Sequence, residues 1–306
     1  MENMLAILVD KIGSIDDIKI KDLSIPEIKE DEILVKVKAV GINPVDWKGV
    51  VNGIFETPYI LGSDVSGVIT NTGSNVKNFK IGDEIIGSLE WSKQGACAEY
   101  VVTKENFITQ KPTNLSFEES AVVPLSSLTA WQGLFTHLNL QSGQKVFITA
   151  GAGGVGLFAI QLAKWKGAYV ITSASATNKD FLISFGADEV IDYQDEDVIT
   201  KIKDIDCAFD SVIMREKLFK VLKKGGKCVS INGKPTPEEI KNYDITAEHF
   251  LFKSDTQDLS EIVDLIEKGK LKVVIDKRFD FKEVKHALEY QKSGHSRGKN
   301  VLILNM

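Results

Sequence analysis

The sequence predicts an α/β protein that combines a β-rich domain with a doubly wound parallel sheet. Up to about residue 115, short apolar segments alternate with Gly and Asn-Pro turn signals, which is typical of a compact, barrel-like β domain. From about residue 145, strand-like and helix-like segments alternate. A glycine-rich turn at 151–156 lies where one such strand passes into a helix. Together these observations predict the fold class.

The first third contains residues 33–40, which alternate with period two as a half-buried strand does. Ser116 and Glu119 have the spacing of a helix capping box. The apolar run 121–135 follows and is interrupted by Pro124. Because proline breaks a helix interior, we expect two helical pieces there.

The middle of the chain predicts parallel strands covered by helices on both faces. Gly186 is well placed to end the second of these helices. The expected strands are 145–149, 168–172, 190–191, 207–209 and 227–231, and the expected helices are 155–166, 178–185 and one that ends at 218–222.

After about residue 255 the pattern changes again. Residues 259–269 form an amphipathic helix with a glycine stop, and the expected segments after it are a strand at 273–275, a helix at 281–291 and a strand at 300–304. This tail has too little apolar material to fold alone, so we expect it to pack on the first domain. The predicted boundaries are 1–124, 125–253 and 254–306.

Composition limits the function. The 306 residues are 43% hydrophobic and 26% charged, with a net charge of −6, which argues against nonspecific nucleic-acid binding. Three cysteines exclude a disulfide framework and suit a reducing compartment. The acidic N-terminus lacks signal-peptide features, and the uncharged stretch 146–163 reads as a strand turning into a helix. We therefore expect a cytoplasmic protein without a membrane span.

The segment Gly151-Ala152-Gly153-Gly154-Val155-Gly156 fits the G-x-G-x-x-G pattern. Its glycines permit a tight turn and a close approach of the backbone to a pyrophosphate, and the helix N-terminus offers free N–H groups. This pattern between a strand and a helix predicts a dinucleotide site.

The end of the second strand favours NADP over NAD. An NAD site places Asp or Glu about 20 residues after the first glycine. Here the segment 172–179 has hydroxyl and amide side chains, ends in Lys179, and meets no acid until Asp180. Hydroxyl groups and a lysine would accept a 2′-phosphate that a carboxylate would repel. Lys179 has an equally good interpretation as a solvated first-turn residue.

Several segments in this order resemble one family over nearly the whole chain. They are 41–48 (GINPVDWK), 61–67 (LGSDVSG), 82–87 (GDEIIG), 95–100 (GACAEY), 128–131 (LTAW), 150–156, 185–193 (FGADEVIDY) and 298–299. The chain resembles the zinc-free, NADPH-dependent quinone oxidoreductase branch of the medium-chain dehydrogenase/reductase superfamily. The resemblance implies a GroES-like catalytic domain, an inserted Rossmann domain for NADP(H), and a homodimer. It implies reduction of quinones or of the C=C bond of α,β-unsaturated carbonyls.

The resemblance also assigns site residues. Asn43 and Lys48 would act at the nicotinamide end, as catalytic and as cofactor-binding residues. Thr177 departs from relatives that have Arg there, which puts the strength of the 2′-phosphate preference in question. The implied cofactor contacts, by position along the chain, are Thr129 at the nicotinamide ribose, Gly151, Gly153, Gly154 and Val155 at the pyrophosphate, Ser173, Ser175, Asn178 and Tyr193 at the adenosine phosphate, and Ile231 and Phe252 over the nicotinamide.

No metal is expected. Zinc-dependent relatives have Cys within 41–46 and Gly-His-Glu at 62–64, where this chain has Asn43 and Gly-Ser-Asp. The four histidines are widely spaced, and a catalytic zinc needs about three protein ligands. Without a Lewis acid, the substrate must be activated by its own conjugation. Tyr59 is a proton donor only if it faces the site, and Cys97 is better read as a core residue than as a reactive thiol.

Two alternatives stay open. The chain could be a zinc-independent dehydrogenase of another carbonyl, or an NADPH-binding protein without catalysis.

Overall fold

The computed structural model describes residues 2–90, 95–195 and 202–304. The described chain forms two compact units. Unit 1 combines Met1–Ser126 with Ser254–Met306, and unit 2 is Ser127–Lys253. The C-terminal tail therefore returns to the N-terminal part of the chain, as its shortage of apolar residues predicts.

Unit 1 is built on a mixed sheet of seven strands in the order β15-β16-β3-β5-β6-β8, with β7 paired to β3. The long strand β3 (Ile33–Ile42) alternates buried and half-buried residues over most of its length, which confirms the expected strand. A second sheet has the order β2-β1-β4. The other bounds in unit 1 are β1 (Asn3–Val9), β2 (Lys19–Ser24), β4 (Tyr59–Ile60), β5 (Asp64–Thr72), β6 (Glu84–Ser88), β7 (Tyr100–Thr103), β8 (Ile108–Gln110), β15 (Ile275–Asp280) and β16 (Lys299–Ile303).

The helices of unit 1 are α1 (Pro44–Asn52), α2 (Phe117–Ala121), the start of α3 (Pro124–Trp131), α9 (Thr256–Glu267) and α10 (Val284–Lys292). The expected break at Pro124 and the capping box of Ser116 are both confirmed, with the Ser116 hydroxyl accepting the Glu119 N–H at 3.2 Å. In the core of unit 1, Phe279, Val284 and Leu288 of the tail pack together with Ile33 and Val35 of β3.

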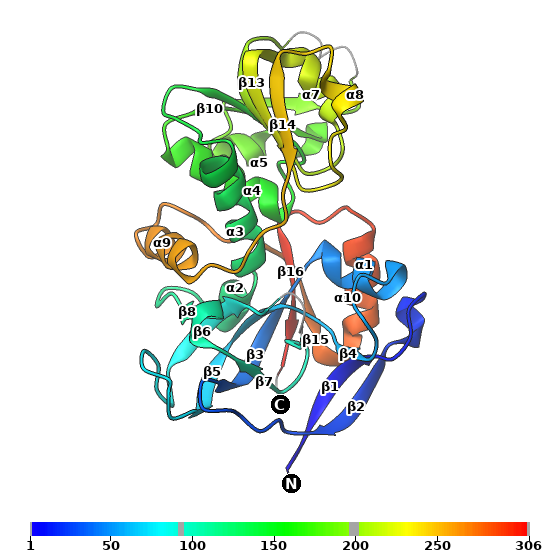
Figure 1. Ribbon diagram of the computed structural model, residues 1–306, viewed down its shortest axis with the longest axis vertical. Helices are drawn as coiled ribbons and strands as arrows, with labels where there is room; N and C mark the ends of the chain where they lie inside the picture. The colour runs from blue at the N-terminus through cyan, green and yellow to red at the C-terminus, as the bar shows by residue number, and fades with distance from the viewer. Residues whose placement is uncertain (1, 91–94, 196–201, 305–306) are drawn as a thin grey trace. The chain divides into compact units, whose positions relative to one another are not determined.

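Unit 2 is a sheet of six strands in the order β11-β10-β9-β12-β13-β14, and every pairing in it is parallel (Figure 1). The strongly apolar α4 packs on the sheet and is buried along most of its length, as a helix that covers a parallel sheet should be. The strands are β9 (Lys145–Ile148), β10 (Tyr169–Ala174), β11 (Glu189–Asp192), β12 (Ile205–Asp210), β13 (Leu222–Ser230) and β14 (Ile245–His249); the helices are the rest of α3, a π-helical stretch at Gln132–His137, α4 (Gly154–Trp165), α5 (Lys179–Ser184), α7 (Arg215–Val221) and α8 (Pro237–Ile240).

Three strands differ from the sequence prediction. The strand β13 begins at Leu222, five residues before the expected strand 227–231. The tail strand occupies Ile275–Asp280 rather than 273–275, because β15 is an edge strand and edges carry charged residues that shorten the apolar signal. The strand β14 was not expected at all. It is also an edge strand, and its residues are only half-buried at best.

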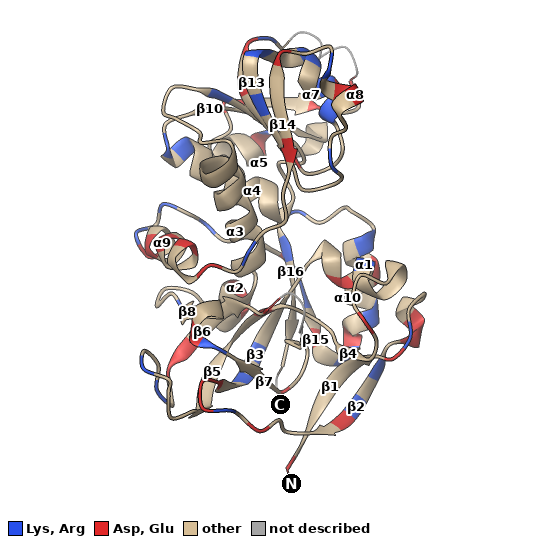
Figure 2. Ribbon diagram, viewed as in Figure 1, with Lys and Arg blue, Asp and Glu red and all other residues tan. Residues whose placement is uncertain are grey.

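Among the described residues, no helix is long and apolar enough to cross a bilayer. Basic and acidic residues are interspersed along the strands and helices of each unit (Figure 2).

Candidate functional site

The turn after β9 packs its backbone tightly against the neighbouring strand. A β-carbon added to Gly151 would overlap the hydroxyl of Thr172 in β10, and one added to Gly156 would overlap the Ala150 carbonyl oxygen. Gly153 differs, because the nearest atom to an added β-carbon is the Ala150 carbonyl oxygen at 3.4 Å. The turn is therefore close-packed on its protein side and open at Gly153, as the approach of a phosphate requires.

The same turn ends at the N-terminus of α4. Gly153 is the N-cap and has no side chain to accept hydrogen bonds from the first helical turn. The first N–H groups of a helix have no acceptor within the helix, and the helix dipole makes this end positive. Gly154 and Val155, which begin α4, are partly exposed. This end of α4 therefore has the features of a diphosphate site.

At the end of β10, the two predicted serines Ser173 and Ser175 have different surroundings. Ser173 is buried, and its hydroxyl accepts the Ala150 N–H at 3.2 Å, so it braces the glycine turn. Ser175, Thr177 and Asn178 form a partly exposed cluster, with Asn178 Nδ2 donating to Ser175 Oγ at 2.9 Å and the two hydroxyls 3.1 Å apart. This cluster provides hydroxyl and amide groups and no carboxylate, which suits a 2′-phosphate.

Tyr193 follows β11 and lies beside the end of β10. Its N–H donates to the Ala174 carbonyl oxygen at 3.3 Å, and its side chain is 52% exposed. Its exposed aromatic ring offers a face on which a flat base can stack, and its backbone is bonded to the residue directly before Ser175. Lys179 begins α5 directly after this cluster and is exposed.

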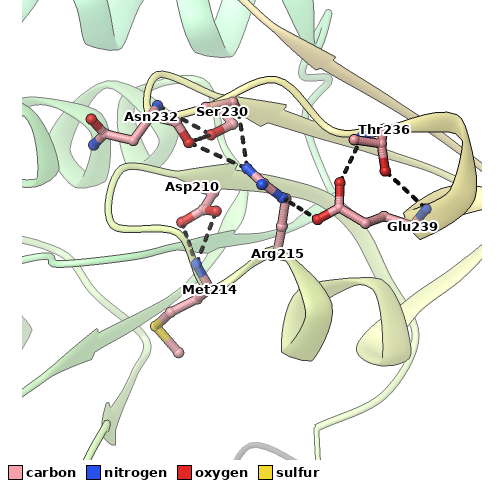
Figure 3. A network of polar contacts seen from close by, with 8 residues as sticks. Asp210, Met214, Arg215, Ser230, Asn232, Thr236 and Glu239 are labelled. Carbon is pink, nitrogen blue, oxygen red and sulfur yellow. Dashed lines mark hydrogen bonds and ion pairs between the residues drawn. The ribbon is translucent and has the colours of Figure 1, made fainter.

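A hydrogen-bond network fixes the turns after β12 and β13 (Figure 3). The buried Asp210 carboxylate accepts the N–H groups of Val212 and Met214 at 3.0–3.1 Å. Arg215 pairs with Glu239 at 2.9 Å and donates to the Gly233 carbonyl oxygen at 3.0 Å. The backbone N–H of Thr236 and the Arg215 guanidinium both donate to the Glu239 carboxylate and lower its pKa to about 2.

The sequence analysis missed this network. An Asp at a strand end followed by Ser is an Asx-turn signal that could have located Asp210. The network holds Ile213 in the left-handed region at φ 61°, which is rare for a β-branched residue. Such strain persists only where surrounding bonds determine the backbone, as the bonds to Asp210 do on both sides of Ile213.

The other predicted site residues of unit 2 are Ile231, Thr129 and Phe252. Ile231 follows β13, and its N–H donates to the Asp210 carbonyl oxygen at 3.1 Å. Thr129 is buried on α3. Phe252 precedes Lys253, whose backbone N–H and C=O both bond the Gln132 side chain, at 3.0 and 2.9 Å. Gln132, which the sequence did not suggest, thus fixes the segment that carries Phe252.

In unit 1, Asn43 is fully buried at the start of α1, and its side chain is engaged at both ends. Its Nδ2 donates to Asp64 Oδ2 at 3.0 Å, and its Oδ1 accepts from Lys299 Nζ. Its backbone N–H donates to Asp46 Oδ2 at 2.7 Å. Lys48 lies further along α1 and is partly exposed, with its ammonium 5.8 Å from the Trp47 ring centre. Both Asn43 and Lys48 therefore belong to the opening turns of α1.

The pKa values of the two carboxyl groups around Asn43 are shifted by burial. Burial raises the Asp46 pKa to about 7, against the lowering effects of the Asn43 N–H and the Lys299 charge. Burial also raises the Asp64 pKa and lowers that of Lys299. One ammonium and two carboxyl groups are thus enclosed together.

Metal ligands do not gather in the described residues, where no group of three or more His, Cys, Asp or Glu side chains could hold an ion. Ser63 and Asp64 stand at the positions discussed for zinc relatives and are buried. All three cysteines are buried, and burial raises the pKa of each thiol. A raised pKa disfavours the reactive thiolate, which fits the interpretation of Cys97 as a core residue.

The open glycine turn, the helix N-terminus and the polar cluster at the end of β10 define a doubly wound dinucleotide-binding unit, joined to a β-rich unit. Two family models match parts of the chain. Residues 29–113 match the alcohol dehydrogenase GroES-like domain, and residues 185–302 match the zinc-binding dehydrogenase family.

Comparisons with individual proteins narrow the class. The chain is 38% identical over 305 residues to 2-methylene-furan-3-one reductase of Solanum lycopersicum, covering 95% of this chain and 76% of the relative. It is 36% identical to the chloroplastic NADPH-dependent alkenal/one oxidoreductase of Arabidopsis thaliana, covering 98% and 80%. The quinone oxidoreductase structure from Coxiella burnetii has a TM-score of 0.93 at 34% identity, covering 99% and 100%. The chain belongs to the quinone oxidoreductase branch of the medium-chain dehydrogenase/reductase superfamily.

Proposed function

We propose that this protein transfers hydride from NADPH to quinones or to the C=C bond of α,β-unsaturated carbonyl compounds. The observation that carries the proposal is the carboxyl edge of the sheet in unit 2, where a glycine turn open at Gly153 adjoins the Ser175, Thr177 and Asn178 cluster. The relatives named for alkenal/one and quinone reduction support the choice of substrate.

The residues fit the cofactor by their chemistry. Gly153 leaves room for the diphosphate, and hydroxyl and amide groups at the end of β10 suit the 2′-phosphate. Ser173 contributes indirectly, because its hydroxyl is bound to the glycine turn. We propose that the cofactor site is formed by the following residues, of which Asn43, Gly151 and Ser173 act through the backbone that they hold or the packing that they permit: Asn43, Lys48, Thr129, Gly151, Gly153, Gly154, Val155, Ser173, Ser175, Asn178, Tyr193, Ile231 and Phe252.

NADPH supplies the hydride when bound, and the protein's task is to orient the acceptor and balance charge. Lys48 is proposed to assist electrostatically at the nicotinamide end, since a cation stabilises negative charge that develops on a substrate oxygen. Asn43, whose side chain is held by Asp64 and Lys299, is proposed to orient this end by fixing the start of α1. A conjugated acceptor delocalises the added charge itself, so the proposed mechanism uses no metal.

The test is a survey of NADPH oxidation with three acceptor classes: quinones, 2-alkenals or enones, and saturated aldehydes. We expect turnover with the first two and little with the third. Turnover with saturated aldehydes alone would favour a dehydrogenase of other carbonyls. Binding of NADPH without oxidation in the presence of any acceptor would favour a protein without catalysis.

We further propose a homodimer in the cytoplasm. The edge strand β14 is a candidate for pairing between subunits, since an edge strand has unpaired backbone groups. Light scattering coupled to size-exclusion chromatography should give the mass of two chains of 33.8 kDa. A fluorescent fusion tests the compartment, because the Arabidopsis relative is named as chloroplastic.

A further inference from the structure

Lys299 is a buried ammonium whose bonds lead to the start of α1. It lies at the beginning of β16 and is 5% exposed. Its Nζ donates to the Ile42 carbonyl oxygen at 2.7 Å and to Asn43 Oδ1. Ile42 and Asn43 are the two residues directly before Pro44, with which α1 begins. The Lys299 side chain, near the C-terminus, therefore forms hydrogen bonds with both residues that lead into α1.

Asp64 forms further hydrogen bonds at the same place. Its carboxylate accepts the Asn43 amide at 3.0 Å and the Leu125 N–H at 3.1–3.2 Å, so it joins the start of α1 to the first turn of α3. Asp46 closes the arrangement from inside α1 by accepting the Asn43 N–H. The bonds thus hold Asn43 from three directions: β16, β5 and α1.

A buried cluster of charges costs desolvation free energy that apolar residues of the same volume would not. Apolar residues of similar volume often replace buried ion pairs without loss of stability, whereas removal of one partner alone is strongly destabilising. A buried ionic group can instead serve to select one geometry among several. Here that geometry is the position of the first turns of α1, which carry Lys48.

We propose that Lys299 is a positioning residue for the nicotinamide end of the site: by fixing Ile42 and Asn43 it sets the place of α1 and hence of Lys48. The inference rests on the proposed function, because that proposal gives Lys48 its role. Lys299 itself is buried within unit 1 and acts through its neighbours.

The test is a double-mutant cycle between residues 48 and 299, read as the NADPH dissociation constant by fluorescence titration and as kcat and KM. Lys48→Ala is measured in the natural chain and in Lys299→Met. We expect Lys48→Ala to weaken NADPH binding about 10-fold in the natural chain and less than about 3-fold in Lys299→Met, where Lys48 is already displaced. A residue that only stabilised the fold would give effects that multiply independently.

Lys299→Met leaves buried carboxylates without their cation, so it can fail to fold. The decisive background is therefore Lys299→Met with Asp64→Asn, which removes one charge of each sign. Lys299→Arg keeps a cation and should restore part of the coupling. Lys292→Met is the matched control, since Lys292 is an exposed lysine of unit 1, 3.7 Å from Glu289. It should change neither binding nor turnover.

The outcomes separate the two proposals. If the natural chain oxidises no NADPH with any acceptor, the proposed function fails, while the binding cycle still decides the role of Lys299. If the natural chain is active and the two substitutions act independently in the charge-balanced background, the positioning role is overturned.

Discussion

Gly151 lies so close to Thr172 that a β-carbon on the glycine would overlap the threonine hydroxyl oxygen. That hydroxyl donates to the Ile148 carbonyl oxygen at 2.8 Å and is fully buried, so it cannot move away without losing a bond. Gly153, two residues on, has room for a β-carbon. The two glycines of one turn therefore serve different purposes, one in packing and one in ligand approach.

This difference makes the first prediction. Gly151→Ala should destabilise the fold by about 2 kcal/mol or more, because a buried overlap forces backbone or rotamer shifts. Gly153→Ala should fold normally and weaken NADPH binding about 10-fold or more, since its methyl group stands where the diphosphate approaches. Thermal melting and fluorescence titration of both variants check this. Equal stability of the two variants would contradict the packing argument.

A second prediction concerns the 2′-phosphate. Ser175→Asp places a carboxylate in the cluster with Thr177 and Asn178, where it repels the phosphate and can accept ribose hydroxyls. KM for NADPH should rise about 10-fold or more while KM for NADH falls or stays unchanged. Ser184→Ala is the control, because that exposed hydroxyl bonds only its own helix, at Phe181. A parallel rise for both cofactors would place the phosphate elsewhere.

Lys48 gives a third prediction. Lys48→Ala should weaken NADPH use more than folding, with kcat/KM for NADPH reduced about 10-fold or more and a melting temperature within about 2 °C of the natural chain. Lys11→Ala is a suitable control, since that side chain is 78% exposed and its acidic partner Asp17 is 3.8 Å away. Unchanged KM and kcat in Lys48→Ala would remove this residue from the site.

The buried Asp46 predicts a pH-dependent stability. Its folded pKa, about 7, lies above the ordinary value for an aspartate, about 4, so the folded state binds the extra proton between these two values. The free energy of unfolding should therefore fall as pH rises from about 4 to about 7, by up to about 4 kcal/mol. The groups that act on the Asp46 pKa are the Asn43 N–H, Lys299 and Asp64. Asp46 in turn contributes to the raised pKa of Tyr59 and of Cys97.

Asp46→Asn tests this, because asparagine keeps an oxygen for the Asn43 N–H and leaves one ammonium beside one carboxylate. Urea unfolding at pH 5 and pH 8 should show similar stability at the lower pH and a more stable variant at the higher. A variant that loses stability equally at both values would show that Asp46 is ionised in the folded state across this range.

A fifth prediction follows from Ile213. Ile213→Gly should raise the free energy of unfolding by about 1 kcal/mol, because glycine removes the left-handed strain, offset in part by its unfolded-state entropy. The side chain is 61% exposed, so little apolar burial is lost. Val212→Gly is the control: its φ is not positive, and it should lose stability. Denaturant unfolding of the pair decides the matter.

Local pattern was enough for much of this fold. Apolar periodicity located the strands β9, β10 and β12 and the helix α4, because strand and helix periods are properties of neighbouring residues. The break at Pro124 and the cap at Ser116 followed from single-residue chemistry. Edge strands were located poorly, as β14 and β15 show, because half-exposed residues leave a weak apolar signal.

The candidate site also has features that short segments of sequence predict and features that only distant contacts set. Glycine spacing alone located the turn at 151–156, and the absence of an acid after β10 favoured NADP, because both depend on a short segment. The hydrogen bond from Lys299 to Asn43 joins residues 256 positions apart in the sequence. It depends on the pairing of β16 with β3, which sets Asn300 opposite Ile42. Sequence therefore determined which groups could bind a dinucleotide. Only the tertiary structure decided that Ser173 and Asn43 have their side chains engaged inside the protein, because burial and partners are set by contacts between distant segments.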